Sequence, residues 1–125
     1  MTLAEETQAA SSAAGTGARR WEPVCPVELL TPDRGVAALV AGEQVAVFLL
    51  GGGEVYALDD VDPFSGAAVL SRGLVGDVDG APTVASPIYK QRFDLRTGRC
   101  IDDGTTSVKT WDARVHEGCL EVALP

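Results

Sequence analysis

Two short turn-rich segments set the strongest limit on how this chain folds. The first reads DPFSG at Asp62–Gly66, and the second reads SPIYKQ at Ser86–Gln91 and runs directly into Arg92–Leu95. Proline, glycine and short polar residues favour tight turns over long helices. Both segments lie between apolar runs of strand length, so the sequence predicts two loops held between groups of strands.

The spacing within these loops resembles that of a Rieske [2Fe–2S] protein, which carries Cys-x-His in its first loop and Cys-x-x-His in its second. Position for position, the four cluster ligands would fall on Asp62, Phe64, Ser86 and Tyr89. A Rieske centre needs two thiolates on one iron and two imidazoles on the other. The chain contains a single histidine, His116, which cannot supply both imidazoles. We therefore predict a cluster-binding scaffold that carries no cluster.

The residues at these four positions are interpreted as a packed substitute for the cluster. A void left between the loops would cost stability, so we expect the rings of Phe64 and Tyr89 to lie close together beneath the loop tips and fill it. On this basis Tyr89→Ala would cost about 3–5 kcal/mol. Asp62 and Ser86 are expected to hold the loops by hydrogen bonds to backbone amides.

Apolar runs separated by turn residues predict an all-β domain from Trp21 onward. The expected strands are Val24–Val27, Gly35–Val40, Gln44–Leu50, Glu54–Leu58, Trp111–His116 and Leu120–Leu124. Gln44–Leu50 is apolar on both faces, which predicts a strand buried on both sides. Residues 59–80 and 86–91 are assigned to the loops. Helical turns are compatible only with Glu28–Leu30 and the region from Val69 to Leu74.

The length and composition predict one small domain. The chain has 125 residues and 46% hydrophobic residues, which suffices for a single core. Residues 1–20 lack the basic start and apolar segment of a signal peptide, so we predict a disordered tail there and a domain at 21–125. No apolar run is long enough to cross a bilayer. The net charge of −8 argues against a nucleic acid or an anionic membrane as the partner.

Two other groups of residues are candidates for a cation site and for a catalytic pair. Asp59, Asp60 and Asp62 could bind a hard cation, but the spacing of a known calcium loop is missing, and a solvated loop with Asp side chains on backbone amides is preferred. His116 and Cys119 could form a base–nucleophile pair. They flank a Glu-Gly turn on the outer side of a hairpin, so an ordinary surface histidine is the preferred interpretation.

The basic residues near the loops are the remaining candidates. Arg72, Lys90, Arg92, Arg96 and Arg99 form a local basic group on an acidic chain. This group is either a scattered solvated surface or a docking patch that steers a partner. Arg72, Lys90 and Arg92 are the candidate docking residues because they follow the loops most closely.

Several stretches together carry a closer resemblance. They are YALD at Tyr56–Asp59, DPFSG at Asp62–Gly66, VLSRG at Val69–Gly73, Val75–Gly76 and SPIYKQRF at Ser86–Phe93. They resemble the small subunit of assimilatory NAD(P)H-dependent nitrite reductase, over roughly Trp21 to Pro125. The resemblance implies a Rieske-like antiparallel β-sandwich or barrel, with a small inserted β-subdomain that carries the two loops and has replaced ligand positions.

The resemblance also implies a function. It predicts a cytoplasmic accessory subunit of an enzyme that reduces nitrite to ammonium with NADH or NADPH. FAD, sirohaem and a [4Fe–4S] cluster would belong to the large subunit, on which this chain docks, and the chain would not be catalytic on its own. Three cysteines without CxxC spacing agree with a reducing cytoplasm. The alternative is a stand-alone Rieske-like interaction module that serves another oxidoreductase.

Overall fold

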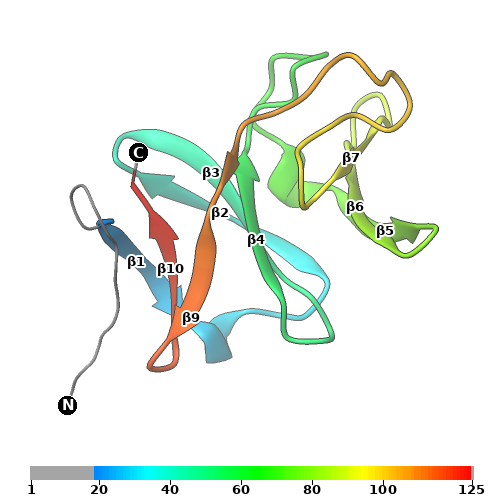
Figure 1. The fold of residues 1–125 in the computed structure, drawn as a ribbon. Helices are drawn as coiled ribbons and strands as arrows, with labels where there is room; N and C mark the ends of the chain where they lie inside the picture. The colour runs from blue at the N-terminus through cyan, green and yellow to red at the C-terminus, as the bar shows by residue number, and fades with distance from the viewer. Residues whose placement is uncertain (1–18, 125) are drawn as a thin grey trace.

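The protein, seen in a computed structural model that describes residues 19–124, consists of three antiparallel sheets (Figure 1). The first sheet has the order β1-β10-β9 and contains β1 (Trp21–Pro26), β10 (Cys119–Ala123) and β9 (Ala113–His116). The second has the order β2-β3-β4-β8 and contains β2 (Arg34–Val40), β3 (Glu43–Leu49), β4 (Val55–Asp59) and β8 (Thr110–Trp111). The third has the order β5-β6-β7 and contains β5 (Leu74–Val78), β6 (Ala81–Ala85) and β7 (Arg92–Asp94).

The helical segments of the described chain are two 3₁₀ turns, η1 (Val27–Leu29) and η2 (Leu70–Arg72). They fall where the sequence is compatible with helical turns. Neither is long and apolar enough to pass through a bilayer. The prediction of an all-β domain made of antiparallel strands is confirmed.

Strand β3 lies at the centre of the molecule, and its consecutive residues Val45–Phe48 are fully buried. Side chains alternate along a strand, so β3 serves two cores at once. Val47 belongs to a cluster that includes Leu120 of the first sheet, whereas Phe48 belongs to a cluster that includes Phe93 of the third sheet. The second sheet accordingly lies between the other two, as Figure 1 shows. The prediction of a strand buried on both sides is confirmed, whereas the expectation of a single core is wrong, because the two faces of β3 pack into separate clusters.

Three hairpins share the same two-residue turn. In each, a residue with positive φ precedes a glycine with positive φ: Ala41-Gly42, Asp79-Gly80 and Glu117-Gly118. This geometry matches the twist of the flanking strands and favours glycine at the second position. The turns at Ala41-Gly42 and Glu117-Gly118 agree with the sequence prediction. Asp79-Gly80 joins β5 to β6, so the assignment of residues 59–80 to a loop is wrong at its C-terminal end.

The predicted strand Trp111–His116 is divided between two sheets. Trp111 in β8 pairs with Ala57 of the second sheet, whereas β9 pairs with β10 of the first. The chain changes sheets at Asp112, which is how strands turn the corner of a sandwich. As a consequence Trp111 is buried but Val115 is 44% exposed, so the expected inward face of this strand does not continue to its end.

The two ends of the described chain lie beside each other. Trp21 pairs with Ala123 across the β1–β10 ladder, and the Arg20 carbonyl accepts a hydrogen bond of 2.7 Å from the Leu124 amide. Arg19 and Arg20 therefore contact the domain. The rest of the predicted tail, residues 1–18, lies outside the described residues.

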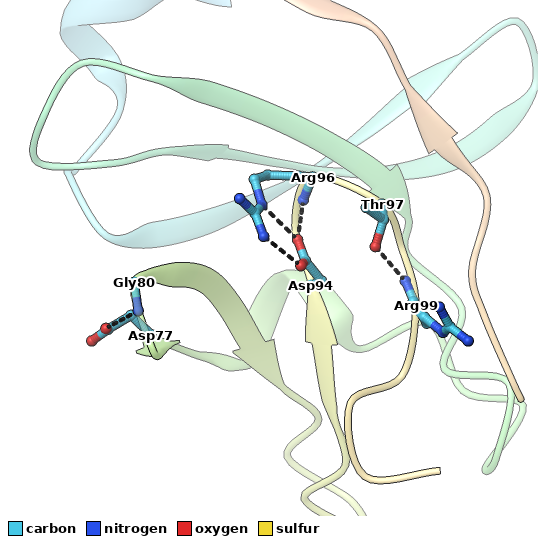
Figure 2. A network of polar contacts seen from close by, with 6 residues as sticks. All are labelled: Asp77, Gly80, Asp94, Arg96, Thr97 and Arg99. Atoms are coloured by element: carbon cyan, nitrogen blue, oxygen red, sulfur yellow. Dashed lines mark hydrogen bonds and ion pairs between the residues drawn. The ribbon is translucent and has the colours of Figure 1, made fainter. Parts of the chain in front are cut away.

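Strand β7 ends in a tight turn that is held by its own aspartate (Figure 2). Asp94 accepts hydrogen bonds from the Arg96 amide at 2.8 Å and from the Arg96 guanidinium at 3.0 and 3.2 Å. The guanidinium bonds hold the pKa of Asp94 below its usual value. The turn closes at Gly98, where a Cβ atom would lie 2.1 Å from the Val108 carbonyl oxygen, so only glycine fits.

Candidate functional site

The first loop follows β4 and is built around buried carboxylates. The Asp60 carboxylate accepts a hydrogen bond of 2.7 Å from the Ser71 amide, and the Asp62 carboxylate accepts one of 2.8 Å from the Phe64 amide. The Gly66 amide donates to the Asp62 carbonyl at 2.7 Å. Asp60 and Asp62 are 2% and 0% exposed, so the expectation of a solvated loop is wrong, although the expected bonds to amides are present.

The aspartates of this loop do not converge on a cation site. Asp59 accepts from the indole nitrogen of Trp111 at 2.8 Å, whereas Asp60 and Asp62 each serve a different partner. Within residues 19–124, no three carboxylate, thiol or imidazole side chains are grouped so that they could hold a metal ion.

The second loop follows β6 and closes on Ser86. The Ser86 amide donates to the Gln91 carbonyl at 2.9 Å, and the Lys90 amide donates to the Ser86 carbonyl at 3.0 Å. The Ser86 hydroxyl accepts a hydrogen bond of 3.2 Å from the Ile88 amide. Lys90 has a φ of 68°, a left-handed conformation that a lysine adopts at some cost in energy. These contacts fix the loop as a tight turn.

A buried hydrogen bond joins the two loops. The Ser86 hydroxyl donates to the second oxygen of Asp62 at 2.5 Å, and both residues are at most 1% exposed. A hydroxyl-to-carboxylate bond of this length belongs to the strong, charge-assisted class. The sequence predicted that Asp62 and Ser86 bond to backbone amides, which is confirmed, but it did not predict this direct bond between them.

The two aromatic residues of the loops behave differently. Phe64 is half-buried and packs against the core, with its ring centroid 6.2 Å from that of Phe93. Tyr89 is 60% exposed, so the expectation that both rings fill the space beneath the loop tips is wrong for Tyr89. The hydrogen bonds that close the second loop on Ser86 turn its apex outward, and Tyr89 lies at that apex. The buried Asp62–Ser86 hydrogen bond links the two loops instead.

The four loop positions that the sequence spacing assigns to Rieske ligands do not carry Rieske ligand types. They carry a carboxylate, a phenyl ring, a hydroxyl and a phenol, whereas a Rieske [2Fe–2S] centre uses two thiolates and two imidazoles. The cysteines lie elsewhere: Cys25 in β1 and Cys119 in β10 belong to the first sheet, and Cys100 is buried in a core cluster. His116 also belongs to the first sheet, in β9.

His116 and Cys119 face each other across the β9–β10 ladder. The His116 imidazole nitrogen Nε2 lies 3.8 Å from the Glu117 carboxylate, and the Cys119 sulfur contacts the Leu120 carbonyl at 3.5 Å. Among the contacts of residues 19–124, none joins the thiol of Cys119 to the imidazole, which supports the surface interpretation. Burial, with a smaller contribution from Cys119, raises the pKa of the Cys25 thiol, so that thiol is not activated either.

Arg92, a candidate docking residue, is already paired. Its guanidinium donates to the two oxygens of Asp102 at 2.7 and 3.3 Å, and its amide donates to the same carboxylate at 2.7 Å. These bonds lower the pKa of Asp102, which keeps the carboxylate charged. The positive charge of Arg92 is therefore offset within the chain.

The other four basic residues of this group differ in whether a described residue binds their charged group. The Arg96 guanidinium is bound to a carboxylate in the turn after β7, and Arg99 donates to the Gly104 carbonyl at 3.2 Å. Within the described part of the chain, Lys90 and Arg72 form no ion pair. Arg99 likewise forms no ion pair among these residues, because its acceptor is a neutral carbonyl, so Arg72, Lys90 and Arg99 keep charges that no described carboxylate offsets.

A groove lies away from the loops. It has a volume of about 560 Å³ and lies between the β3–β4 turn and the β5–β6 hairpin. Its lining includes three carboxylates, those of Asp33, Glu54 and Asp77, together with Arg96. Two of these lining residues, Asp77 and Arg96, are labelled in Figure 2. The sequence pattern did not indicate it, because its residues come from four separate segments.

Comparison with known proteins gives consistent matches. Residues 20–123 match the model of the Rieske-like [2Fe–2S] domain family. The nitrite reductase (NADH) small subunit of Salmonella typhimurium is 44% identical over 104 residues, which is 82% of this chain and 96% of that protein. A crystal structure from Mycobacterium tuberculosis, described as an NADH-dependent nitrite reductase small subunit, superposes with a TM-score of 0.83 at 50% identity, covering 86% of this chain and 96% of that one.

A further relative is a much longer protein. The nitrite reductase NAD(P)H large subunit of Klebsiella oxytoca is 44% identical over 100 residues, which is 80% of this chain but only 10% of that protein. The domain thus occurs both as a small chain and as a part of a long one. The all-β architecture and the extent of these matches indicate the same family. The chain belongs to the family of NADH-dependent nitrite reductase small subunits, within the Rieske-like [2Fe–2S] domain family.

Proposed function

We propose that this chain is a cytoplasmic accessory subunit that docks on a large nitrite reductase chain and binds no iron–sulfur cluster itself. The enzyme reduces nitrite to ammonium with electrons from NADH or NADPH, and the large chain carries FAD, sirohaem and a [4Fe–4S] cluster, as the family resemblance implies. The small chain stabilises or gates the large one and does not transfer electrons. Three free thiols agree with a reducing compartment.

The observation that carries the cluster-free role is the buried hydrogen bond between Asp62 and Ser86. By the loop spacing, these residues occupy the positions at which two thiolates would bind one iron. Here the Ser86 hydroxyl instead donates its hydrogen bond to the Asp62 carboxylate. Inserting a cluster would break this pair and leave a buried carboxylate without its donor, which is costly. Nothing at the positions of Phe64 and Tyr89 provides a nitrogen ligand to compensate.

Support for the partner comes from the Klebsiella oxytoca relative. In that protein a domain 44% identical to this one forms about a tenth of the large subunit itself. A domain that occurs within the large chain of a relative is expected to act beside that chain when it is encoded separately. We propose that Lys90 and Arg72 contribute positive charge to this contact, whereas Arg92, a third candidate, is offset by Asp102.

The experiment is to purify the full chain alone and together with the large nitrite reductase chain of the same organism. We expect the small chain alone to bind no iron after anaerobic reconstitution with iron and sulfide. We expect it to co-purify with the large chain and to raise NAD(P)H-driven nitrite reduction. A visible cluster spectrum with about two irons per small chain would overturn the cluster-free role.

Failure of the two chains to co-purify, with no effect on nitrite reduction, would overturn the subunit role. That outcome would favour the alternative, a stand-alone interaction module that serves another oxidoreductase. The two readings are independent, because iron content is measured on the small chain alone and docking is measured on the pair.

A further inference from the structure

The apices of the two loops place a group of apolar side chains in solvent. This group, called the tip surface here, consists of Pro63 from the first loop and Pro87, Ile88 and Tyr89 from the second. Ile88 is 46% exposed and Tyr89 is 60% exposed, and both prolines are exposed as well. The hydrogen bond between Asp62 and Ser86 ties together the two loops directly beneath these side chains.

The tip surface is held rigid from below. The backbone of the second loop is closed by bonds from the Lys90 amide to the Ser86 carbonyl and from the Ser86 amide to the Gln91 carbonyl. The first loop is closed by the bond from the Gly66 amide to the Asp62 carbonyl. A surface that is already ordered loses little conformational entropy when it binds, so its apolar contacts contribute more of their energy to affinity.

A positive charge stands at the edge of this apolar group. Lys90 follows Tyr89 directly, is exposed and forms no ion pair with the described residues. Its left-handed backbone conformation, at φ 68°, would suit glycine better. An aromatic anchor with a charged rim is the usual composition of a protein–protein contact.

We infer that the tip surface is the face that docks on the large nitrite reductase chain, with Ile88 and Tyr89 as apolar anchors and Lys90 as a rim charge. This inference rests on the proposed function and specifies its contact face. The complementary site is an apolar pocket with acidic residues at its rim. The apolar tips provide the affinity, and the charge of Lys90 contributes to orientation and association rate.

A second copy of this chain is a poor occupant of the same face. The chain has a net charge of −8, so two copies repel each other. The large chain is the occupant we propose, because a domain 44% identical to this one forms part of the Klebsiella oxytoca large subunit. Other strongly exposed apolar residues, Leu39 on β2 and Leu74 on β5, lie on strands outside the two loops and serve as controls.

The test measures the affinity of the full-length chain for the purified large chain of the same organism, by a titration at equilibrium. The test variant is Ile88→Ser with Tyr89→Ala, and the matched control is Leu39→Ser with Leu74→Ala. All four residues are exposed, so both variants are expected to keep the melting temperature of the parent. Tyr89→Phe, which keeps the ring, should bind nearly as the parent does.

We expect the tip variant to bind at least about tenfold more weakly and the control to bind within about twofold of the parent. Unchanged affinity of the tip variant, or an equal loss in the control, would overturn the inference while leaving the proposed function intact. No binding by the parent itself would instead overturn the proposed function and the inference with it.

Salt separates the anchors from the rim charge. Raising the salt concentration from about 0.05 to about 0.5 M screens exposed charges. We expect Lys90→Gln to weaken binding at the lower concentration and to match the parent at the higher one, whereas the tip variant is weak at both. A parent complex that dissociates fully in the higher salt would contradict apolar anchoring.

Discussion

At the scale of single residues, Asp62 is held by both oxygens of its carboxylate. Its carboxylate accepts from both the Phe64 amide and the Ser86 hydroxyl while being fully buried. Asp62→Ala leaves a buried hydroxyl and a partly buried amide without an acceptor, so we expect the free energy of unfolding to fall by about 1–3 kcal/mol. Denaturant titration measures the change. Asp103→Ala, which removes a similar turn contact to the Thr105 amide in an exposed loop, should cost clearly less.

The two aromatic residues of the loops should also differ in a stability measurement. Phe64→Ala removes a half-buried ring that packs on Phe93, and we expect a loss of about 1–3 kcal/mol, below the range for a fully buried ring. Tyr89→Ala removes a ring that is 60% exposed and should change stability by less than about 0.5 kcal/mol. Thermal or denaturant unfolding of both variants decides this, and similar losses at the two positions would contradict it.

The spacing in the sequence predicted where these residues stand but not which way they point. The hydrogen bonds that the Asp62 and Ser86 side chains accept from backbone amides join residues two positions apart, so residue type alone predicts them. The bond between them joins positions 24 residues apart, so it depends on how the two loops meet and has no local signal. Tyr89 was expected inside because its position corresponds to a cluster ligand, yet the tight closure of its loop directs it outward.

At the scale of elements, a hairpin could be predicted where clear apolar runs flank its turn. Ala41-Gly42 and Glu117-Gly118 stand between clear apolar runs, and both hairpins follow from the sequence. Asp79-Gly80 is an equally strong turn signal, but its flanking strands contain Gly76 and Pro82, which weaken a strand pattern. The hairpin of β5 and β6 was missed for that reason, although its turn could have revealed it.

The turn after β7 makes the stability of the protein depend on acid. Hydrogen bonds from Arg96 lower the pKa of Asp94 in the folded state, whereas an unfolded aspartate titrates near pH 3.9. The folded state therefore binds fewer protons, and the stabilisation is present above that pH and is lost as the pH falls through the lower folded value. We expect Asp94→Asn to be less stable than the parent at pH 7 but to lose less stability on acidification.

Urea unfolding at several pH values between about 5 and 2.5 brackets the titration of a free aspartate and measures this slope. Because the Arg96 side chain is 53% exposed, the difference between parent and variant should shrink in about 1 M salt. Identical slopes for the two proteins at low pH would show that the turn is not the source of the acid dependence.

At the scale of the whole molecule, the scaffold keeps Asp62 and Ser86 buried and joined to each other, at the positions that the loop spacing assigns to the two thiolate ligands of a Rieske iron. We expect the combined variant Asp62→Cys, Phe64→His, Ser86→Cys and Tyr89→His to bind a cluster after anaerobic reconstitution. Absorption in the visible range and about two irons per chain would demonstrate it. The variant Phe64→His with Tyr89→His alone is the control and should stay colourless. A colourless fourfold variant that remains folded would show that the loops have moved from cluster geometry.

The arrangement of three sheets followed from the resemblance and not from periodicity. Alternation within a strand indicates which faces are buried, and it correctly placed Val45–Phe48 between two cores. It does not indicate which strand lies next to which, and it cannot show that the chain passes from one sheet to another at Asp112. Long-range pairings such as Ala57 with Trp111 belong to the whole chain and leave no trace in a short window of sequence.

The pairing of Trp21 with Ala123 brings the start and the end of the domain to one edge of the first sheet, while Figure 1 places the third sheet on the opposite side of the molecule. A domain whose entry and exit are neighbours behaves as a cassette, because it can be spliced into another polypeptide without stretching its own strands. A covalent link to another polypeptide at that edge would leave the two loops exposed for contact with a partner. The same architecture is thus compatible with a separate chain and with a part of a longer one, and covalent linkage would raise the effective concentration of the domain beside its partner.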